Sequence, residues 1–190
     1  MLTLEQYRQA SIEHRGAHKC GGFPYANGNF LQALPKKLNA TNALEIGTAI
    51  GYSAYCLASS NDDMFVTTID LNPDHEELAK GYWLDLGVSK KIKMLIGQSI
   101  DVLPMLNEQF DIIFFDGFAP DPLECSHYAR LIKDYGVIVT TNLTWNKTTP
   151  QYLQNLNDLG IQTREYYDTS VSSKNVESIK MACEVWESLI

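Results

Sequence analysis

Short apolar runs alternate with longer stretches of helical character from residue 43 to residue 159. The expected strands are Ala43–Ile46, Phe65–Asp70, Ile92–Ile96, Phe110–Asp116 and Gly136–Thr140. The expected helices are Tyr52–Ser59, Pro73–Leu86, Ile100–Leu106, Pro122–Lys133 and Pro150–Leu159. Strands that alternate with helices through short connections form βαβ units, whose parallel sheet is covered on both faces. The pattern therefore predicts an α/β fold with a doubly wound, mostly parallel sheet.

The two ends of the chain depart from this alternation. Residues 4–12 fit an amphipathic helix, "HKCGGFPYANG" (18–28) reads as a turn-rich loop, and Asn29–Leu38 fits a second helix. Near the other end, "GIQTREYYDTSV" and "ESIKMACEVW" fit two further strands that pair as a hairpin. The last of these segments fits a helix as well, and its periodicity leaves both alternatives open. With the hairpin, we predict seven strands and an antiparallel C-terminal edge.

The composition is that of an ordinary globular protein. The 190 residues are 45% hydrophobic and 20% charged, with no repeat, low-complexity tract or linker, so we expect a single domain. No apolar run reaches the length of a membrane span, and the first residues lack the apolar core of a secretory signal. The four cysteines are scattered, without metal-binding spacing. We therefore expect a cytoplasmic protein with reduced thiols and no membrane partner.

The first expected strand runs into a turn with two glycines, in "NALEIGTAIGYSAYCLA" (42–58). In a doubly wound sheet, ligands bind beyond the carboxyl ends of the strands, next to such a turn. A triphosphate site needs a lysine and a hydroxyl residue after the second glycine, and neither follows Gly51. A dinucleotide site, as in NAD-binding domains, favours glycine at the position that Ala49 holds. S-adenosylmethionine carries no phosphate, so it suits this turn better.

Two acids stand at the ends of consecutive expected strands. Glu45 directly precedes the turn, where it can bind the ammonium group of S-adenosylmethionine or simply cap the turn. Asp70, in "TTIDLNPD", can accept two ribose hydroxyls or cap the helix expected from Pro73. Because the two acids occur together, we favour a ligand that contains ribose.

These segments resemble the class I S-adenosylmethionine-dependent methyltransferases. "LEIGTAIGYSA" (44–54) is similar to their glycine motif, in particular to that of the O-methyltransferase family that includes catechol and caffeoyl-CoA O-methyltransferases and bacterial relatives. Further similar segments follow in order at 67–88, 91–106, 110–117 and 135–145. The resemblance implies a Rossmann-like core over residues 41–190. Residues 1–40 are then expected to form N-terminal helices and a loop that covers the cofactor and the acceptor.

The resemblance also implies S-adenosylmethionine as the cofactor and assigns its contacts. The residues expected around the methionine portion are Glu45, Gly47, Thr48, Gly51 and Ser53. Those expected around the ribose and the adenine are Asp70, Leu71, Gln98 and Ser99. Gly22 and Phe23 are expected in a loop that closes over the cofactor, and Asp116 is a further expected cofactor contact. A helix cap for Ser53 and a place in the core for Phe23 remain open alternatives.

The metal site of the family is altered in this chain. Metal-dependent members place an Asp, and later an Asp-Asn pair, around Mg²⁺ or Ca²⁺, which lowers the pKa of the acceptor hydroxyl. Asp116 and Asn142 match this pattern, but Thr141 replaces the second Asp. The family's lysine is missing from "DGFAPDP" (116–122). We therefore do not expect a divalent metal, and Asp116 is a residual ligand, a base, or a residue that stabilises the turn near the cofactor.

The candidate catalytic residues are Asp116, Asn142 and His18, the last because it lies in the loop expected beside the acceptor. His127 and Asp121 are further candidate bases, with a surface or packing role as the alternative for His127. Three aromatic residues fit either an acceptor pocket or core packing: Tyr25, Phe118 and Trp145.

We expect an enzyme that transfers a methyl group to a hydroxyl oxygen of a small molecule. A methyltransferase acting on tRNA or other RNA is an alternative, because relatives modify tRNA hydroxyuridine. The net charge of −8 and the lack of a Lys/Arg stripe argue against a nucleic-acid partner. A non-catalytic module that binds S-adenosylmethionine or its demethylated product is a second alternative, since the metal-site residues have changed. Among oligomers in general a symmetric dimer is the commonest assembly, so a homodimer is the assembly we consider for this chain.

Overall fold

The fold is built on a central sheet whose strands run in the order β3-β2-β1-β4-β5-β7-β6. In this computed structural model, the described residues are 2–18, 25, 28–141, 143, 146–167 and 178–182; for His18 and for residues 164–167 and 178–182 only the backbone is described. The parallel strands are β1 (Asn42–Ile46), β2 (Phe65–Asp70), β3 (Ile92–Ile96), β4 (Phe110–Phe115) and β5 (Ile132–Thr140). The strand order reverses between β1 and β4, which is the switch point of a doubly wound fold.

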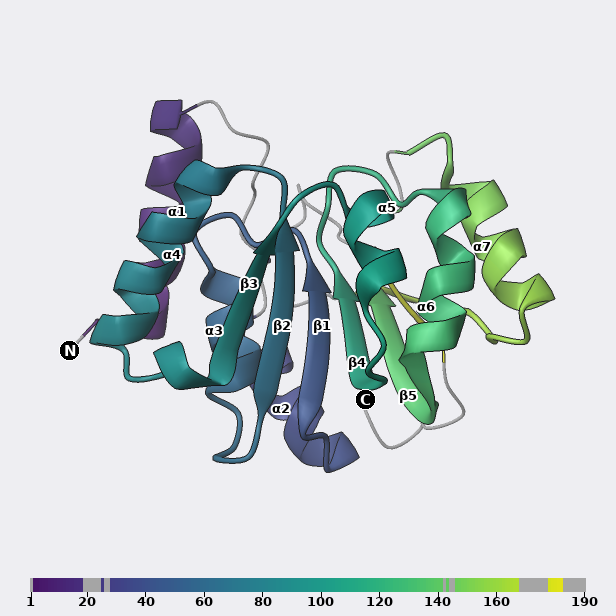
Figure 1. Cartoon of the computed structure of the whole chain (residues 1–190), viewed down its shortest axis with the longest axis horizontal. Helices are drawn as coiled ribbons and strands as arrows, with labels where there is room; N and C mark the ends of the chain where they lie inside the picture. Colours follow the sequence, from purple (N-terminus) through teal and green to yellow (C-terminus); the bar gives the residue numbers. More distant parts are fainter. Residues whose placement is uncertain are drawn as a thin grey trace.

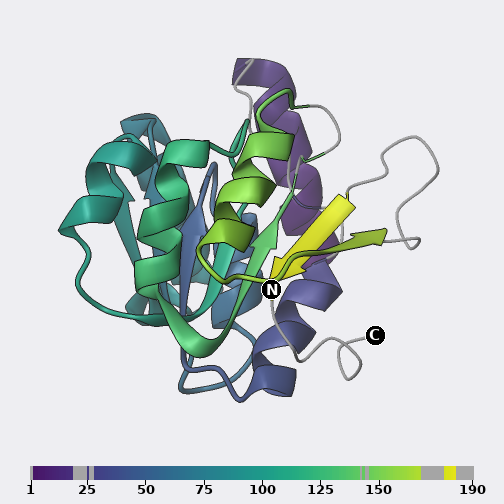
Figure 2. The same cartoon turned by 90° about the vertical axis from the view of Figure 1, so that its right-hand side faces the viewer.

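Helices cover both faces of the sheet (Figures 1 and 2). On one face lie α1 (Leu4–His18), α2 (Gly28–Leu38), α3 (Tyr52–Ala58) and α4 (Pro73–Asp85). On the other lie α5 (Ser99–Val102), α6 (Cys125–Leu131) and α7 (Thr149–Asp158). The described residues also contain three 3₁₀ turns: η1 (Ser89–Lys91), η2 (Leu103–Met105) and η3 (Pro122–Glu124). The predicted α/β, Rossmann-like class with helices on both faces is confirmed.

The strands are buried on both sides, and the side chains of consecutive residues pack into two separate hydrophobic cores, one on each face of the sheet. Ala43 of β1 and Phe114 of β4 pack under α1–α4, whereas the next residues, Leu44 and Phe115, pack under α5–α7. This follows from the period of two in an extended strand. A strand with apolar residues at nearly every position is what a sheet covered on both faces requires.

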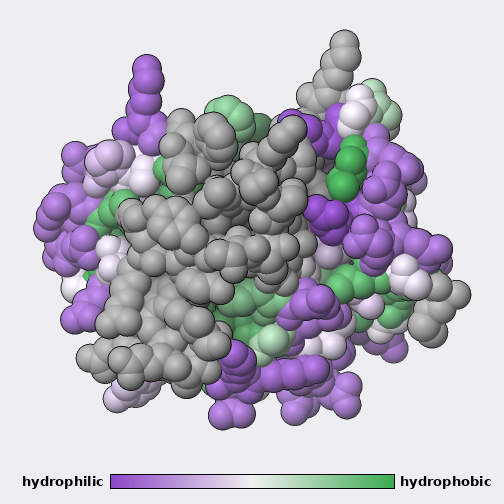
Figure 3. Space-filling model, turned by 180° about the vertical axis from the view of Figure 1, so that it is seen from behind, coloured by the Kyte–Doolittle hydropathy of each residue, from purple (hydrophilic) through white to green (hydrophobic). Residues whose placement is uncertain are grey.

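Two C-terminal strands extend the parallel sheet. β7 (Ser178–Ala182) pairs antiparallel with β5, and β6 (Arg164–Tyr167) pairs antiparallel with β7. The parallel sheet itself has five strands, and the count of seven is reached only with these two. Residues 178–182 thus form a strand, in the segment for which the sequence also allowed a helix. Seen from behind, hydrophilic side chains dominate the margins of the described surface (Figure 3).

The N-terminal helix is fastened to the glycine turn. Tyr7 of α1 is fully buried, and its hydroxyl donates to the backbone oxygen of Ile50 at 2.6 Å. Its ring stacks on Tyr82 of α4, with centroids 4.6 Å apart, and meets Tyr52 of α3 edge-on. The predicted helices at residues 4–12 and 29–38 are both present, as α1 and α2. One phenol therefore ties α1 to the turn, α3 and α4.

Two predicted helices end two or more residues earlier than their patterns indicated. The helix expected over 122–133 stops at Leu131, because Ile132 and Lys133 already belong to β5. The Lys133 ammonium pairs with Asp111 of β4 at 2.7 Å and bonds Asn42 at 3.1 Å, which holds this stretch against the sheet. The helix expected over 100–106 becomes 3₁₀ after Val102, where Pro104 cannot donate an α-helical hydrogen bond.

Replacing Gly51 by alanine should destabilise the fold by about 3 kcal/mol. Gly51 has φ +87°, and an added Cβ would lie 2.5 Å from the buried ring of Trp83. Gly81→Ala on the same helix as Trp83 is the matched control, since a Cβ there meets nothing within 4 Å and should stabilise the helix by about 0.5 kcal/mol. Urea unfolding monitored by circular dichroism measures both; equal effects of the two variants would contradict the packing argument.

Candidate functional site

The candidate site lies at the carboxyl edge of the parallel strands, around the turn from Gly47 to Gly51. Gly47 has φ +96° and its amide donates to Ile69 of β2 at 2.9 Å. A Cβ at Gly47 would lie 2.8 Å from the backbone oxygen of Asp116, just after β4. The turn is therefore wedged between the ends of the two strands that flank β1, where only glycine fits.

Asp70, at the end of β2, holds this turn. Its Oδ2 accepts the backbone amides of Thr48 at 3.0 Å and Ala49 at 2.7 Å. Its Oδ1 accepts the amide of Asn72 at 2.8 Å and bonds Nδ1 of His75 at 3.1 Å. Four partners fill the usual acceptor positions of one carboxylate. A ribose hydroxyl that binds Asp70 must therefore replace or share one of these bonds.

The same contacts keep Asp70 ionised. Burial alone would raise its pKa, but the bonds from His75, Asn72 and Ala49 outweigh burial and hold the pKa below its usual value. Asp70 does not cap α4, because that cap is the Asn72 side chain, which accepts the amide of Asp74 at 3.0 Å. The sequence alternative of a helix cap at Asp70 is thus wrong in detail, since the cap is two residues later.

Glu45 lies beneath the turn and is completely buried. Its Oε2 accepts the hydroxyl of Thr68 at 2.5 Å, and Thr68 is in turn 2.5 Å from the hydroxyl of Thr48. Because Thr68 gives its only proton to Glu45, Thr48 must donate to Thr68. A line of hydroxyls thus connects the buried carboxyl to the turn above it.

The other oxygen of Glu45, Oε1, is buried and has no hydrogen-bond partner among the described residues. Desolvation raises the pKa of Glu45 to about 7, although the hydroxyls of Ser53 and Thr68 lower it in part. A buried acid with an unused oxygen is costly unless a donor is supplied. Such a group suits a ligand that brings an ammonium to this end of the turn.

The end of β3 supplies a second group of predicted residues. Gln98 is exposed and precedes α5, and the amide of Gly97 donates to the Asp70 backbone oxygen at 2.9 Å. The Ser99 hydroxyl donates to the carboxylate of Glu124. Leu71 is 66% exposed at the end of β2, beside them. An exposed leucine next to a polar strand end is compatible with a flat, partly apolar ligand group.

Asp116 and Thr141, at the ends of β4 and β5, are in direct contact. The Thr141 hydroxyl donates to Oδ1 of Asp116 at 2.6 Å and lies 3.2 Å from the backbone oxygen of Phe115. Thr141 is fully buried. Within the described parts of the chain, no three His, Cys, Asp or Glu side chains gather closely enough to hold a metal ion. Thr141 thus orients Asp116 by a hydrogen bond at the position where the family pattern places an acid.

The remaining candidates are divided between other roles and positions outside the described residues. Asp121 caps η3 by accepting the Leu123 amide at 2.9 Å, and His127 is half-buried on α6. Tyr25 is buried edge-on against Phe114, while Phe118 is 88% exposed. The predictions for Gly22, Phe23, Asn142 and Trp145 lie outside the described residues, as does the side chain of His18.

Sequence reasoning missed three polar side chains beside the predicted residues. Thr68 bonds Glu45, His75 bonds Asp70, and Glu124 bonds Ser99. The polar pair in "FVTTID" is a usable signal, because a hydroxyl in a strand buried on both faces needs a partner. His75 stands one turn beyond the acid in "DLNPDH". No sequence signal singles out Glu124.

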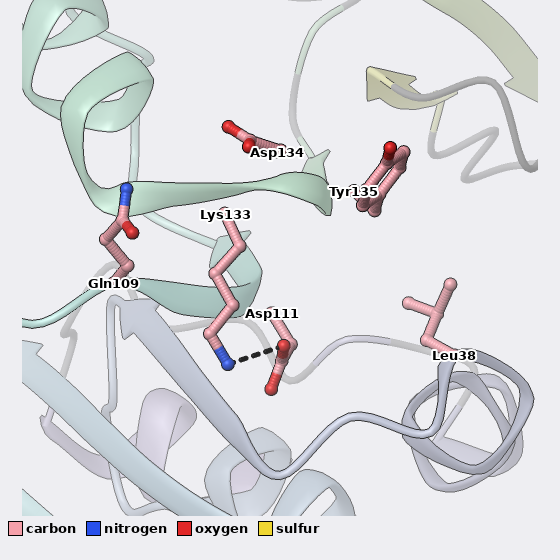
Figure 4. Close-up of a pocket in the computed structure, with 6 residues that line it drawn as sticks. All are labelled: Leu38, Gln109, Asp111, Lys133, Asp134 and Tyr135. Atoms are coloured by element: carbon pink, nitrogen blue, oxygen red, sulfur yellow. Dashed lines mark hydrogen bonds and ion pairs between the residues drawn. The ribbon is translucent and has the colours of Figure 1, made fainter.

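The cavity in Figure 4 belongs to the opposite edge of the sheet. It is lined by Leu38, Gln109, Asp111, Lys133, Asp134 and Tyr135. Here the Asp111 carboxylate accepts the Lys133 ammonium and the amides of Thr41 and Asn42, and thereby joins the amino ends of β1, β4 and β5. Its polar groups are used to fasten strands, so this cavity is separate from the candidate site.

Known proteins similar to this chain share its family pattern. A family model described as O-methyltransferase matches residues 2–159. A catechol O-methyltransferase of Niastella koreensis is 33% identical over 122 residues, covering 61% of this chain and 55% of that protein. The O-methyltransferase imqG of Aspergillus flavus is 32% identical over 150 residues, covering 74% of this chain and 60% of that protein. The chain thus spans less than two thirds of the length of these relatives.

Solved structures resemble the fold closely. The O-methyltransferase TomG from Streptomyces achromogenes, involved in tomaymycin synthesis and solved in complex with SAM, has a TM-score of 0.76 at 21% identity, covering 93% of this chain and 88% of that chain. An O-methyltransferase from Bacillus cereus in complex with SAH has a TM-score of 0.74 at 21% identity, covering 93% of this chain and 90% of that chain. At these identities the likeness concerns the fold.

Glu45 should make the stability of the chain depend on pH. An acid whose folded pKa is raised from 4.5 to about 7 stabilises the fold fully below pH 4.5 and loses this contribution as pH rises to about 7. The loss amounts to at most about 3 kcal/mol. Urea unfolding of the wild type and of Glu45→Gln between pH 4.5 and 8 should show the wild type losing stability relative to the variant. Parallel stability curves would contradict the raised pKa.

Proposed function

The chain belongs to the O-methyltransferase family, and on that premise we propose that it transfers a methyl group from S-adenosylmethionine to a hydroxyl oxygen of a small molecule. The observation that carries this proposal is the pairing of two acids around one glycine turn. Glu45 lies under the turn with an unused buried oxygen, and Asp70 holds the turn from the side. An ammonium group and a ribose are the two parts of this cofactor that such acids recognise.

The residues present fit the cofactor along the carboxyl edge. Glu45 binds the ammonium end through its unused Oε1, and Gly47, Thr48, Gly51 and Ser53 surround the methionine portion. Asp70 binds the ribose in exchange for one of its four present donors. The residues assigned to the adenine are Leu71, Gln98 and Ser99, with Gly22 and Phe23 in the covering loop. Bound there, S-adenosylmethionine supplies an electrophilic methyl group on a positively charged sulfur.

Asp116 is the residue that we assign to the acceptor hydroxyl. The Thr141 hydroxyl fixes its Oδ1, so the carboxylate keeps one orientation at the strand end. Asp116 receives the proton of the acceptor as the oxygen attacks, and positioning of the two reactants supplies much of the rate. Asn142 and His18 are assigned to the rim of this acceptor site. We also assign to this site Phe118, whose exposed ring can cover a flat acceptor.

We propose that the reaction needs no divalent cation. A hard-oxygen site for Mg²⁺ or Ca²⁺ relies on several carboxylates, and Thr141 supplies a neutral hydroxyl in place of one. The hydroxyl also gives its proton to Asp116, which further weakens that acid as a metal ligand. A module that binds the cofactor without transfer is the alternative that these same changes favour.

The remaining parts of the proposal concern the class of acceptor, the location and the assembly. The net charge of −8 favours a small acceptor over RNA. No described helix has the length and apolar character needed to span a membrane. We place the protein in the cytoplasm, treat residues 1–190 as one domain, and expect a homodimer as its assembly.

Asp70→Ala should weaken the binding of S-adenosylhomocysteine by more than about tenfold, because both the ribose contact and the anchor of the turn are lost. Asp74→Ala is the matched control, since Asp74 is an exposed acid four residues further along the chain. Isothermal titration calorimetry with S-adenosylhomocysteine, and with NAD as a negative control, measures both. Unchanged affinity in Asp70→Ala would show that the ribose assignment is wrong.

Asp116→Asn should lower methyl transfer to a panel of phenols and catechols by about a hundredfold, as expected for loss of a base. Asp121→Asn should keep the wild-type rate, because Asp121 serves as a helix cap. The wild-type rate should be the same with EDTA as with added Mg²⁺. Radiolabelled methyl transfer measures all three, and abolition of the rate by EDTA would refute the metal-free mechanism.

A further inference from the structure

A buried carboxylate stands next to the end of β3 without a cation. Glu124 is only 3% exposed, and it forms no ion pair among the residues that the structure describes. Its Oε1 accepts the hydroxyl of Ser99, and its Oε2 accepts the hydroxyl of Tyr128. Keeping an acid in the interior without a cation is costly, and two hydroxyl donors are what compensates it.

The direction of both hydrogen bonds is fixed by chemistry. The pKa of the Tyr128 phenol is raised well above its ordinary value, first by burial and then by the neighbouring Glu124, so Tyr128 keeps its proton and donates it. Ser99 likewise donates its single hydroxyl proton to Oε1. A hydroxyl has one proton and two lone pairs. With its proton committed to Glu124, Ser99 can offer only lone pairs to anything else.

Ser99 stands where the base of a bound nucleoside is expected. The glycine turn follows β1, the ribose-binding Asp70 ends β2, and Ser99 follows β3, so the three lie in sequence across adjacent strands. A ligand with its amino-acid end at the turn and its ribose at Asp70 directs the base toward β3. Ser99 is half-buried, and Leu71 lies exposed at the adjacent strand end.

We propose that Glu124 is a specificity-determining residue, which fixes Ser99 as a hydrogen-bond acceptor and so makes the base subsite select a purine with a 6-amino group over one with a 6-oxo group. This inference rests on the proposed function. Adenine presents an N–H donor at position 6, which an acceptor satisfies. A 6-oxo purine presents a second acceptor there, and two acceptors that face each other leave both without a proton.

The substitution Glu124→Gln reverses the polarity of this contact. Tyr128 donates to Oε2, so the amide oxygen of Gln takes the Tyr128 side and its NH₂ group faces Ser99. The NH₂ then donates to Ser99, and the Ser99 proton is freed to point at the base. The variant should therefore accept the 6-oxo group that the wild type rejects.

The experiment measures the affinities of S-adenosylhomocysteine and of its 6-oxo analogue, S-inosylhomocysteine, by calorimetry on the full chain. The wild type should bind S-adenosylhomocysteine at least about tenfold more tightly than S-inosylhomocysteine. In Glu124→Gln the affinities for the two ligands, whose ratio is the readout here, should differ by less than about threefold. Tyr128→Phe is the matched control, since it removes the other bond of the same carboxylate and should leave the ratio at the wild-type value.

Ser99→Ala separates a direct role of Glu124 from a structural one. It removes the acceptor, so it should lower the ratio on its own, and it remains informative if Glu124→Gln fails to fold. In the Ser99→Ala background, adding Glu124→Gln should change the ratio by less than about twofold. An equal effect of Glu124→Gln in both backgrounds would overturn the inference, because Glu124 would not be acting through Ser99.

The outcomes also distinguish this inference from the proposed function. If the wild type binds neither ligand, the proposed function fails and this inference fails with it. If the wild type binds both ligands equally, the proposed function stands and the base-selection inference is refuted. A preference that survives in both Ser99→Ala and Glu124→Gln likewise refutes it.

Discussion

The four hydrogen bonds to the Asp70 carboxylate are the contacts on which the site depends. They join the amides of the glycine turn to the end of β2 and to the first turn of α4. Without this carboxylate, the amides of Thr48 and Ala49 would lose their acceptor. The hydrogen bond that stabilises the positive φ of +46° at Ala49 would then be missing. Asp70 is therefore a part of the turn's structure as well as a candidate ligand contact. Because the same carboxylate holds the turn and is the proposed ligand contact, the conformation of the turn is coupled to ligand binding.

Most of the fold could be predicted because the decisive signals are local. Apolar runs such as Phe110–Phe115 are too short for helices, and Asn72-Pro73 marks a helix start directly. The boundary between α6 and β5 could not be found in this way, since no glycine or proline separates Leu131 from Ile132. What fixes that boundary is the contact of Lys133 with Asp111, which lies far away in the sequence. Such a contact exists only once the sheet has formed.

The site shows the same division between local and long-range information. The positions of Glu45 and Asp70 follow from strand ends, which a pattern can locate. The partners of these acids do not, because Thr68 of the neighbouring strand β2 and His75 of helix α4 are selected by side-chain geometry in the folded chain. The replacement of an acid by Thr141 was visible in the sequence, but its donation of a proton to Asp116 was not. Sequence patterns thus indicate which groups gather, while the structure gives the direction of each proton.

The contact of Tyr7 with Ile50 gives the N-terminal helix a place in the energetics of ligand binding. Since the phenol of Tyr7 is fully buried between α1 and the turn, α1 cannot separate from the rest of the fold without breaking the hydrogen bond to Ile50 in the turn. Any ligand that stabilises the turn then also disfavours local opening of α1, so amide exchange in α1 reports on occupancy of the site. Conversely, damage to α1 raises the free energy of the bound state without touching the ligand. The stability of α1 therefore contributes to the affinity of the site for its ligand.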